Sequence, residues 1–188
     1  MNELAVYTRP CTNIIISNTM QETAAELDTT TNYAPEDYLH SGLLIFGSVF
    51  PQEKDGRVIL DKVMLFENES TLWMPDLRLL LFNSSECDIV PVKNAQHNWT
   101  TFCTLENCVA IVDIVSANWK SQAHYSGSLK TEQARAVVSV GDIITNEPLN
   151  NTIRQTRDLV GFLLVKGANL SKFQSGAKFK VSLQVTQA

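Results

Sequence analysis

Three histidines, His40, His97 and His124, are the side chains best suited to acid–base chemistry near neutral pH. No second histidine lies three or four residues from any of them, so the paired-histidine helix motif of zinc proteases is absent. The GxSxG turn that presents a nucleophilic serine is also absent. Each histidine stands in a separate polar stretch, and we therefore expect none of the three to be catalytic.

Two pairs of neighbouring carboxylates are the other candidates for catalysis. Glu36 and Asp37 follow a proline, and Glu67 and Glu69 follow an apolar run. A glycosidase needs two carboxylates that face each other across a cleft. We interpret Glu67 and Glu69 as solvated charges of a turn. The segment with Glu36 and Asp37 is expected to begin a turn, with Asp37 capping backbone N–H groups. The sequence therefore predicts that the protein is not an enzyme.

Glycines and cysteines give no sign of a cofactor or a metal. The eight glycines occur mostly singly, and we interpret Gly161 and the others as turns or bulges rather than a phosphate-binding loop. Cys103 and Cys108 are five residues apart and could share a zinc ion or a disulfide, but no CxxC pair is present. We expect the four cysteines to be ordinary thiols in a reducing compartment.

Five aromatic residues are the candidates for a partner interface: Trp73, Trp99, Trp119, Tyr7 and Tyr33. Each tryptophan has polar or turn-like neighbours, and Trp and Tyr concentrate in the energetically dominant parts of interfaces. Two other interpretations remain open. The tryptophans could close the ends of the core with the indole N–H bonded to a loop carbonyl, or they could form a platform for sugars.

The composition is that of a weakly acidic protein rich in strands and turns. The chain has 188 residues and a formal net charge of −5, and its pI is near 5.2. No cluster of Lys and Arg is present, so direct binding of nucleic acid is not expected. No run approaches the roughly 20 apolar residues that span a bilayer, and no signal peptide is visible. We expect synthesis in the cytoplasm and no membrane contact.

Short apolar segments separated by turn residues recur from residue 42 onward. Expected strands cover residues 42–50, 57–68, 76–82, 88–92, 108–115, 158–167 and 177–185. Residues 130–135 fit a short helix, and residues 136–140 fit a further strand. About eight to ten short strands with few helices are typical of an antiparallel fold. The sequence predicts an all-β protein, a jelly-roll-like antiparallel β-sandwich with few short helices.

The last strand has the clearest pattern. Apolar and polar residues alternate from Ala177 to Gln187, so Phe179 and Val181 are expected to be buried and Lys180 to be exposed. The two final strands, joined by residues 168–176, are expected to pair as a hairpin. In the strand over 57–68 the alternation changes phase at Asp61 and Lys62, which predicts a β-bulge.

Residues 1–32 differ from the rest of the chain. They contain two candidate strands, at 3–8 and 12–17, and a candidate short helix at 21–28. Such a segment is either an N-terminal arm that packs on a neighbour or a set of edge strands of the same domain. Residues 33–188 are expected to form the β-sandwich domain.

Three blocks in this order resemble a known family. They are "NYAPEDYLHSGLLIFGSVF", "GRVILDKVMLFENESTLWMPDLRLLLFNSS" and "DLVGFLLVKGANLSKFQSGAKFKVSLQV". Together they resemble small virion structural proteins of tailed bacteriophages, described as minor structural or head-decoration-like proteins. The resemblance covers residues 33–187, and the region 94–151 is longer and more irregular than the family pattern.

The resemblance implies a non-enzymatic protein of the virion, made in the cytoplasm of the host bacterium. The implied role is a capsid decoration or cement protein that stabilises contacts between major capsid subunits, as a trimer or dimer. The implied partners are the major capsid protein or other virion proteins. Two alternatives remain open: a neck, tail or baseplate component, and a carbohydrate-binding module of a fibre that uses the tryptophans.

Overall fold

The computed structural model describes residues 12–21, 27–51, 57–67, 74–83, 87, 89–99, 108–126, 129–145, 157–167, 172–173 and 177–187. Within these residues the chain forms nine β-strands and one short 3-10 helix, η2, and no α-helix. In chain order these are β1 (Thr12–Gln21), β2 (Leu44–Phe46), β3 (Arg57–Glu67), β4 (Leu77–Asn83), β5 (Cys108–Ile114), η2 (Ser116–Asn118), β6 (Trp119–Ser126), β7 (Leu129–Thr145), β8 (Leu159–Val165) and β9 (Lys178–Gln187).

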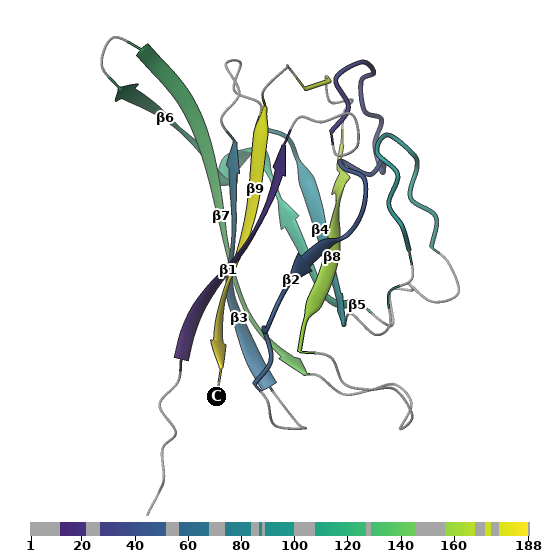
Figure 1. The fold of residues 1–188 in the computed structure, drawn as a ribbon, viewed down its shortest axis with the longest axis vertical. Coiled ribbons are helices and arrows are strands. Elements are labelled where there is room, and N and C mark those ends of the chain that lie inside the picture. The colour runs from purple at the N-terminus through teal and green to yellow at the C-terminus, as the bar shows by residue number, and fades with distance from the viewer. Residues whose placement is uncertain are drawn as a thin grey trace, which may run out of the picture.

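The strands form two sheets that face each other as a sandwich (Figure 1). The five-stranded sheet has the order β1-β9-β3-β7-β6, and the four-stranded sheet has the order β2-β8-β4-β5. All pairs are antiparallel. The predicted all-β sandwich is therefore confirmed. The strands near the start pair with those near the end: β1 with β9, β2 with β8, β3 with β7 and β4 with β5. This nested pairing is jelly-roll connectivity, with β6 added beside β7.

The main core lies between the two sheets and is lined by alternate residues of each strand. On β9, Phe179, Val181, Leu183 and Val185 are buried, and Lys180 is exposed, as the alternation predicts. On β3 the pairing register shifts between Leu60 and Lys62, which confirms the predicted bulge. The bulge lets Leu60 and Val63 both reach the core although they are three residues apart.

The prediction that the last two strands pair as a hairpin is wrong. β8 lies between β2 and β4, and β9 lies between β1 and β3 in the other sheet. Their burial explains the difference. All seven residues of β8 are buried, whereas β9 exposes Lys178 and Lys180 on one face. A strand buried on both faces needs a sheet that is covered on both sides, so β8 and β9 occupy different layers.

Three further expectations are corrected. Residues 130–135 belong to the 17-residue strand β7 and not to a helix, because pairing with β6 and β3 outweighs their helix propensity. The described residues 89–92 form no strand, and Pro91 is held by a hydrogen bond from the Gly42 N–H instead. Residues 108–115, a β-branched run interpreted as a buried strand, contain β5, which is the edge strand of its sheet and exposes Ile111.

Part of the N-terminal segment packs with the sandwich. β1 pairs with β9 in register from Thr12 to Gln21, and Leu27 is fully buried in the main core. The candidate strand at 3–8 and most of the candidate helix at 21–28 lie outside the described residues. Among the described residues, no helix has the length and hydropathy that crossing a membrane requires.

Candidate functional site

Two of the five aromatic candidates are used inside the core. Trp119 is 6% exposed, and its indole Nε1–H donates to the Pro75 carbonyl at 3.0 Å. Tyr33 is 1% exposed; its hydroxyl donates to the Leu39 carbonyl at 2.9 Å and accepts from the backbone N–H of Asp28 at 2.6 Å. These contacts match the interpretation in which aromatic side chains close the end of the core.

Trp99 is the one candidate tryptophan that the structure describes as exposed, at 43%. Its ring meets the ring of His97 edge-on, with centroids 4.6 Å apart. Trp73 and Tyr7 lie outside the described residues. Within the described part of the chain, the aromatic candidates are therefore not gathered into one platform of the kind that sugar binding uses.

Trp99 borders a second apolar cluster on the outer face of the four-stranded sheet. The cluster contains Phe82 of β4, Phe162 of β8 and Tyr38. Two loop segments cover it. The backbone N–H of Tyr38 donates to the Ala95 carbonyl at 3.0 Å. The Tyr38 hydroxyl lies 2.6 Å from Nδ1 of His97. This cover explains why β4 and β8 carry long uninterrupted runs of apolar residues.

The histidines that the structure describes have structural positions. His40 is 1% exposed, and its Nε2 accepts the backbone N–H of Leu163 at 3.2 Å, which ties the loop before β2 to β8. Burial lowers the pKa of His40 to about 4, and burial also lowers the pKa of His97. Both imidazoles are therefore neutral at pH 7.

The neutral histidines predict loss of stability in mild acid. In the unfolded chain His40 has a pKa near 6.5, so between pH 6.5 and 4 the unfolded state binds a proton that the folded state does not. The free energy of unfolding should therefore fall as the pH is lowered through this range, by up to about 3 kcal/mol from His40. Urea unfolding at a series of pH values measures this.

The variant His40→Gln should show a shallower decline, because it removes the titrating group and keeps an oxygen acceptor for the Leu163 N–H. Two carboxylates, Asp28 and Asp113, affect the free energy of unfolding in a separate and more acidic range of pH. Burial opposes ionisation of Asp28, but hydrogen bonds from Thr30 and Thr31 prevail and lower its pKa to about 2. The hydrogen bond from Arg78 lowers the pKa of Asp113 to about 2 as well. An equally steep decline in His40→Gln between pH 6.5 and 4 would contradict the assignment.

Two of the candidate carboxylates that the structure describes, Asp37 and Glu67, are buried. Asp37 Oδ2 accepts the backbone N–H of Ala34 at 2.6 Å, which confirms the predicted cap. Glu67, interpreted as a solvated turn charge, is instead 2% exposed at the end of β3, because the odd positions after the bulge face the core. Glu69 lies outside the described residues. The described residues contain no group of three or more His, Cys, Asp or Glu side chains able to hold a metal ion.

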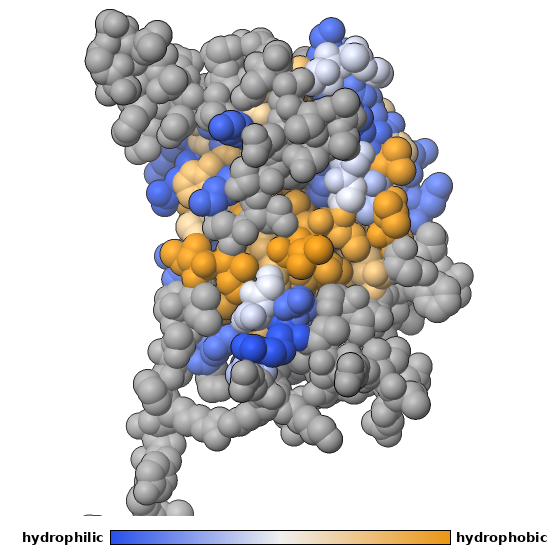
Figure 2. Space-filling view, viewed as in Figure 1, coloured by the Kyte–Doolittle hydropathy of each residue, from blue (hydrophilic) through white to orange (hydrophobic). Residues whose placement is uncertain are grey.

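The feature most suited to binding a macromolecule is an apolar edge where β1 and β2 lie side by side. Figure 2 shows apolar side chains in a band across the middle of this face. We define the apolar edge by the exposed side chains of these two strands, Ile15 of β1 (62%) and Ile45 of β2 (58%). β1 and β2 are also the outermost strands of their sheets.

β1 has none of the features that usually protect an edge strand. Its ten residues, "TNIIISNTMQ", contain no charge and no proline. Exposed strand edges in monomeric proteins normally carry lysine, proline or a bulge, which prevent another strand from pairing there. The sequence contains a feature that indicates this surface. In the run Ile14–Ile15–Ile16, alternation along a strand turns the middle side chain to the face opposite that of the other two.

The fold and this edge define the chain as an all-β sandwich with jelly-roll connectivity and an exposed apolar side. Comparisons with protein-family models, with curated proteins and with solved structures each found no match.

Proposed function

We propose that this chain is a non-enzymatic structural protein of a bacteriophage particle, and that it decorates the capsid across contacts between major capsid subunits. The observation that carries the proposal is the apolar edge of Ile15 and Ile45, on the neighbouring outermost strands of a jelly-roll sandwich. Jelly rolls recur in viral capsid proteins. Edge strands that expose large apolar side chains are typical sites for binding another protein.

Burial of this edge supplies the mechanism of the proposed role. A stable protein contact covers about 1,200–2,000 Å² in total. A subunit that binds the assembled shell but not its free subunits stabilises the shell by mass action, and many bound copies add their effects. The uncharged strand β1 could also extend a sheet of a neighbour, as in strand addition. A dimer or trimer of the chain is part of the proposal.

The copy number of the chain in purified particles tests the proposal. We expect quantitative mass spectrometry to find hundreds of copies per particle, in a fixed ratio to the major capsid protein. A dozen copies or fewer would favour the alternative role in the neck, tail or baseplate. Absence from the particles would overturn the virion role and return the sugar-binding alternative to consideration.

A matched pair of variants tests whether the apolar edge is the docking surface. Ile45→Asp on β2 should lower the number of bound copies, because a charge would have to be buried in the contact. Ile143→Asp should leave the number unchanged, because Ile143 is equally exposed, at 68%, but lies on β7. Equal effects of both variants would show that the edge is not the contact surface.

A further inference from the structure

A row of positive side chains crosses the outer face of the five-stranded sheet. Lys120 of β6 pairs in register with Arg135 of β7, Arg135 pairs with Phe66 of β3, and Phe66 pairs with Lys180 of β9. Their chain neighbours Trp119, Ala134, Ala136, Phe179 and Val181 are buried in the core. Because successive side chains of a strand point to opposite faces, the four members of the row point away from the core. We call these four residues the basic row.

The ring of Phe66 makes a cation–π contact with Arg135 and another with Lys180. The guanidinium carbon of Arg135 and the Nζ of Lys180 each lie 5.8 Å from the centroid of its ring. Such cation–π contacts restrict the positions of long side chains that would otherwise move freely. Neighbouring strands are about 4.8 Å apart, so the basic row places three positive charges along about 15 Å of flat sheet.

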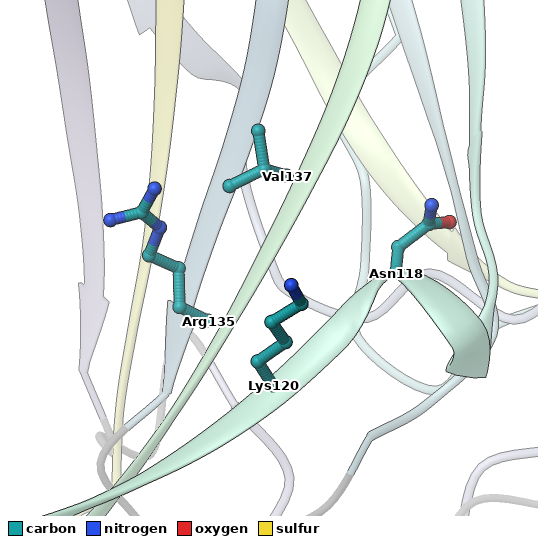
Figure 3. Close-up of a pocket in the computed structure, with 4 residues that line it drawn as sticks. All are labelled: Asn118, Lys120, Arg135 and Val137. Atoms are coloured by element: carbon teal, nitrogen blue, oxygen red, sulfur yellow. The ribbon is translucent and has the colours of Figure 1, made fainter.

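A pocket opens at the end of the basic row nearest the sheet edge. It has a volume of about 370 Å³ and is lined by Asn118, Lys120, Arg135 and Val137. Lys120 and Arg135 extend from the neighbouring strands β6 and β7, Val137 lies further along β7, and Asn118 stands at the end of η2 (Figure 3). Among the described residues, the lining therefore combines two positive groups, one amide and one apolar side chain.

These cations have no carboxylate partner within the described part of the chain. Among the described residues, no carboxylate forms an ion pair with Lys120, Arg135 or Lys180, and all three residues are exposed. Arg78 and Lys166, by contrast, share the carboxylate of Asp113. In a chain whose net charge is −5, three cations in a row without a carboxylate form a local positive surface.

The chemistry of the pocket favours a carboxylate that belongs to a protein. The planar guanidinium of Arg135 matches a carboxylate through two parallel hydrogen bonds, and Lys120 adds a point charge on the next strand. Val137 offers an apolar contact for the short CH₂ stem of an Asp or Glu side chain. The overall negative charge repels a long polyanion such as a nucleic acid more strongly than a short acidic segment, whose few carboxylates interact mainly with the basic row.

We propose that this pocket binds an Asp or Glu side chain of an acidic protein segment, with Arg135 and Lys120 as its ligands. The binding concerns the isolated protein, so its test is separate from that of the role in the particle. The probe is a hexaglutamate peptide with blocked ends, titrated into the purified full chain at low salt. Two-dimensional NMR or calorimetry measures the affinity.

Arg135→Gln is expected to weaken peptide binding roughly tenfold, because it removes a charge-assisted pair of hydrogen bonds. Lys120→Gln should weaken binding in the same direction. Arg57→Gln is the matched control: it also removes one exposed arginine charge from the five-stranded sheet. It lies nine residues before Phe66, about 30 Å away along β3. The control should bind the peptide within about twofold of the unaltered chain.

Three results would overturn the proposal. The unaltered chain could fail to bind the peptide at low salt. Arg57→Gln could weaken binding as much as Arg135→Gln, which would show only a general effect of net charge. A single-stranded oligonucleotide or inorganic phosphate could bind more tightly than the peptide and with the same dependence on Arg135, which would assign the pocket to phosphate instead.

Discussion

Phe179→Asp is expected to prevent the chain from folding, with the free energy of unfolding lowered by more than about 4 kcal/mol. Phe179 is fully buried on β9, and its ring lies 6.0 Å from the ring of Trp119 and 6.4 Å from that of Phe173, measured between centroids. A carboxylate at this position would lose its hydration among aromatic rings. It would also lie opposite Glu67, its buried register partner on β3, so two carboxyl groups would compete for one apolar site.

Lys180→Asp, one residue away, is the matched control for this prediction. Lys180 is exposed, and the structure shows its ammonium over Phe66. Its replacement should cost less than about 1 kcal/mol, the value of an exposed cation–π contact. Far-UV circular dichroism and urea unfolding of both variants make the measurement. If the two variants unfold alike, the register of β9 described here is incorrect.

The second large effect is expected from Gly161→Ala, which should lower the free energy of unfolding by about 2 to 3 kcal/mol. Gly161 lies in the middle of β8, between Leu44 of β2 and Leu81 of β4. A Cβ atom at this position would lie 2.5 Å from the backbone oxygen of Leu80 and 2.9 Å from Cδ2 of Leu81. The first contact is with backbone, which cannot rotate away, so β4 would have to move.

Gly47→Ala is the control, because the same added methyl group meets only an ordinary van der Waals contact there. The nearest atom to its Cβ would be Oδ1 of Asp158, at 3.8 Å. We expect a change of less than about 1 kcal/mol, and a small gain in stability is the expected sign because alanine restricts the unfolded chain. Thermal or urea unfolding of both variants gives the comparison. A Gly161→Ala variant as stable as Gly47→Ala would contradict the close approach of β4 and β8.

Gly161 illustrates why part of the fold was not visible in the sequence. A single glycine in the run "DLVGFLLV" is compatible with a turn, a bulge or a close contact, and it was interpreted as a turn or bulge. A glycine is needed there because the backbone of β4, about 80 residues earlier in the chain, lies too close for a side chain. Such a reason exists only after β4 and β8 have been placed side by side.

The candidate site likewise depends on packing that the sequence does not indicate. The exposed Trp99 and the buried Trp119 stand in similar polar sequence contexts, and only packing distinguishes them. The basic row was equally hidden, because Lys120, Arg135 and Lys180 are far apart in the sequence. Their alignment depends on the pairing of β6, β7, β3 and β9, which joins residues from distant parts of the chain.

The sequence by itself determined the features that depend on neighbouring residues. Alternation set the buried face of β9, a change of phase located the bulge at residues 61 and 62, and the series of short apolar runs established an all-β sandwich. The tertiary structure decided which strands pair, that β8 and β9 lie in different sheets, and which apolar and basic side chains share a surface. The alternation of apolar and polar residues within a strand shows which of its faces is buried. Which strands pair depends instead on burying the apolar side chains of the whole core.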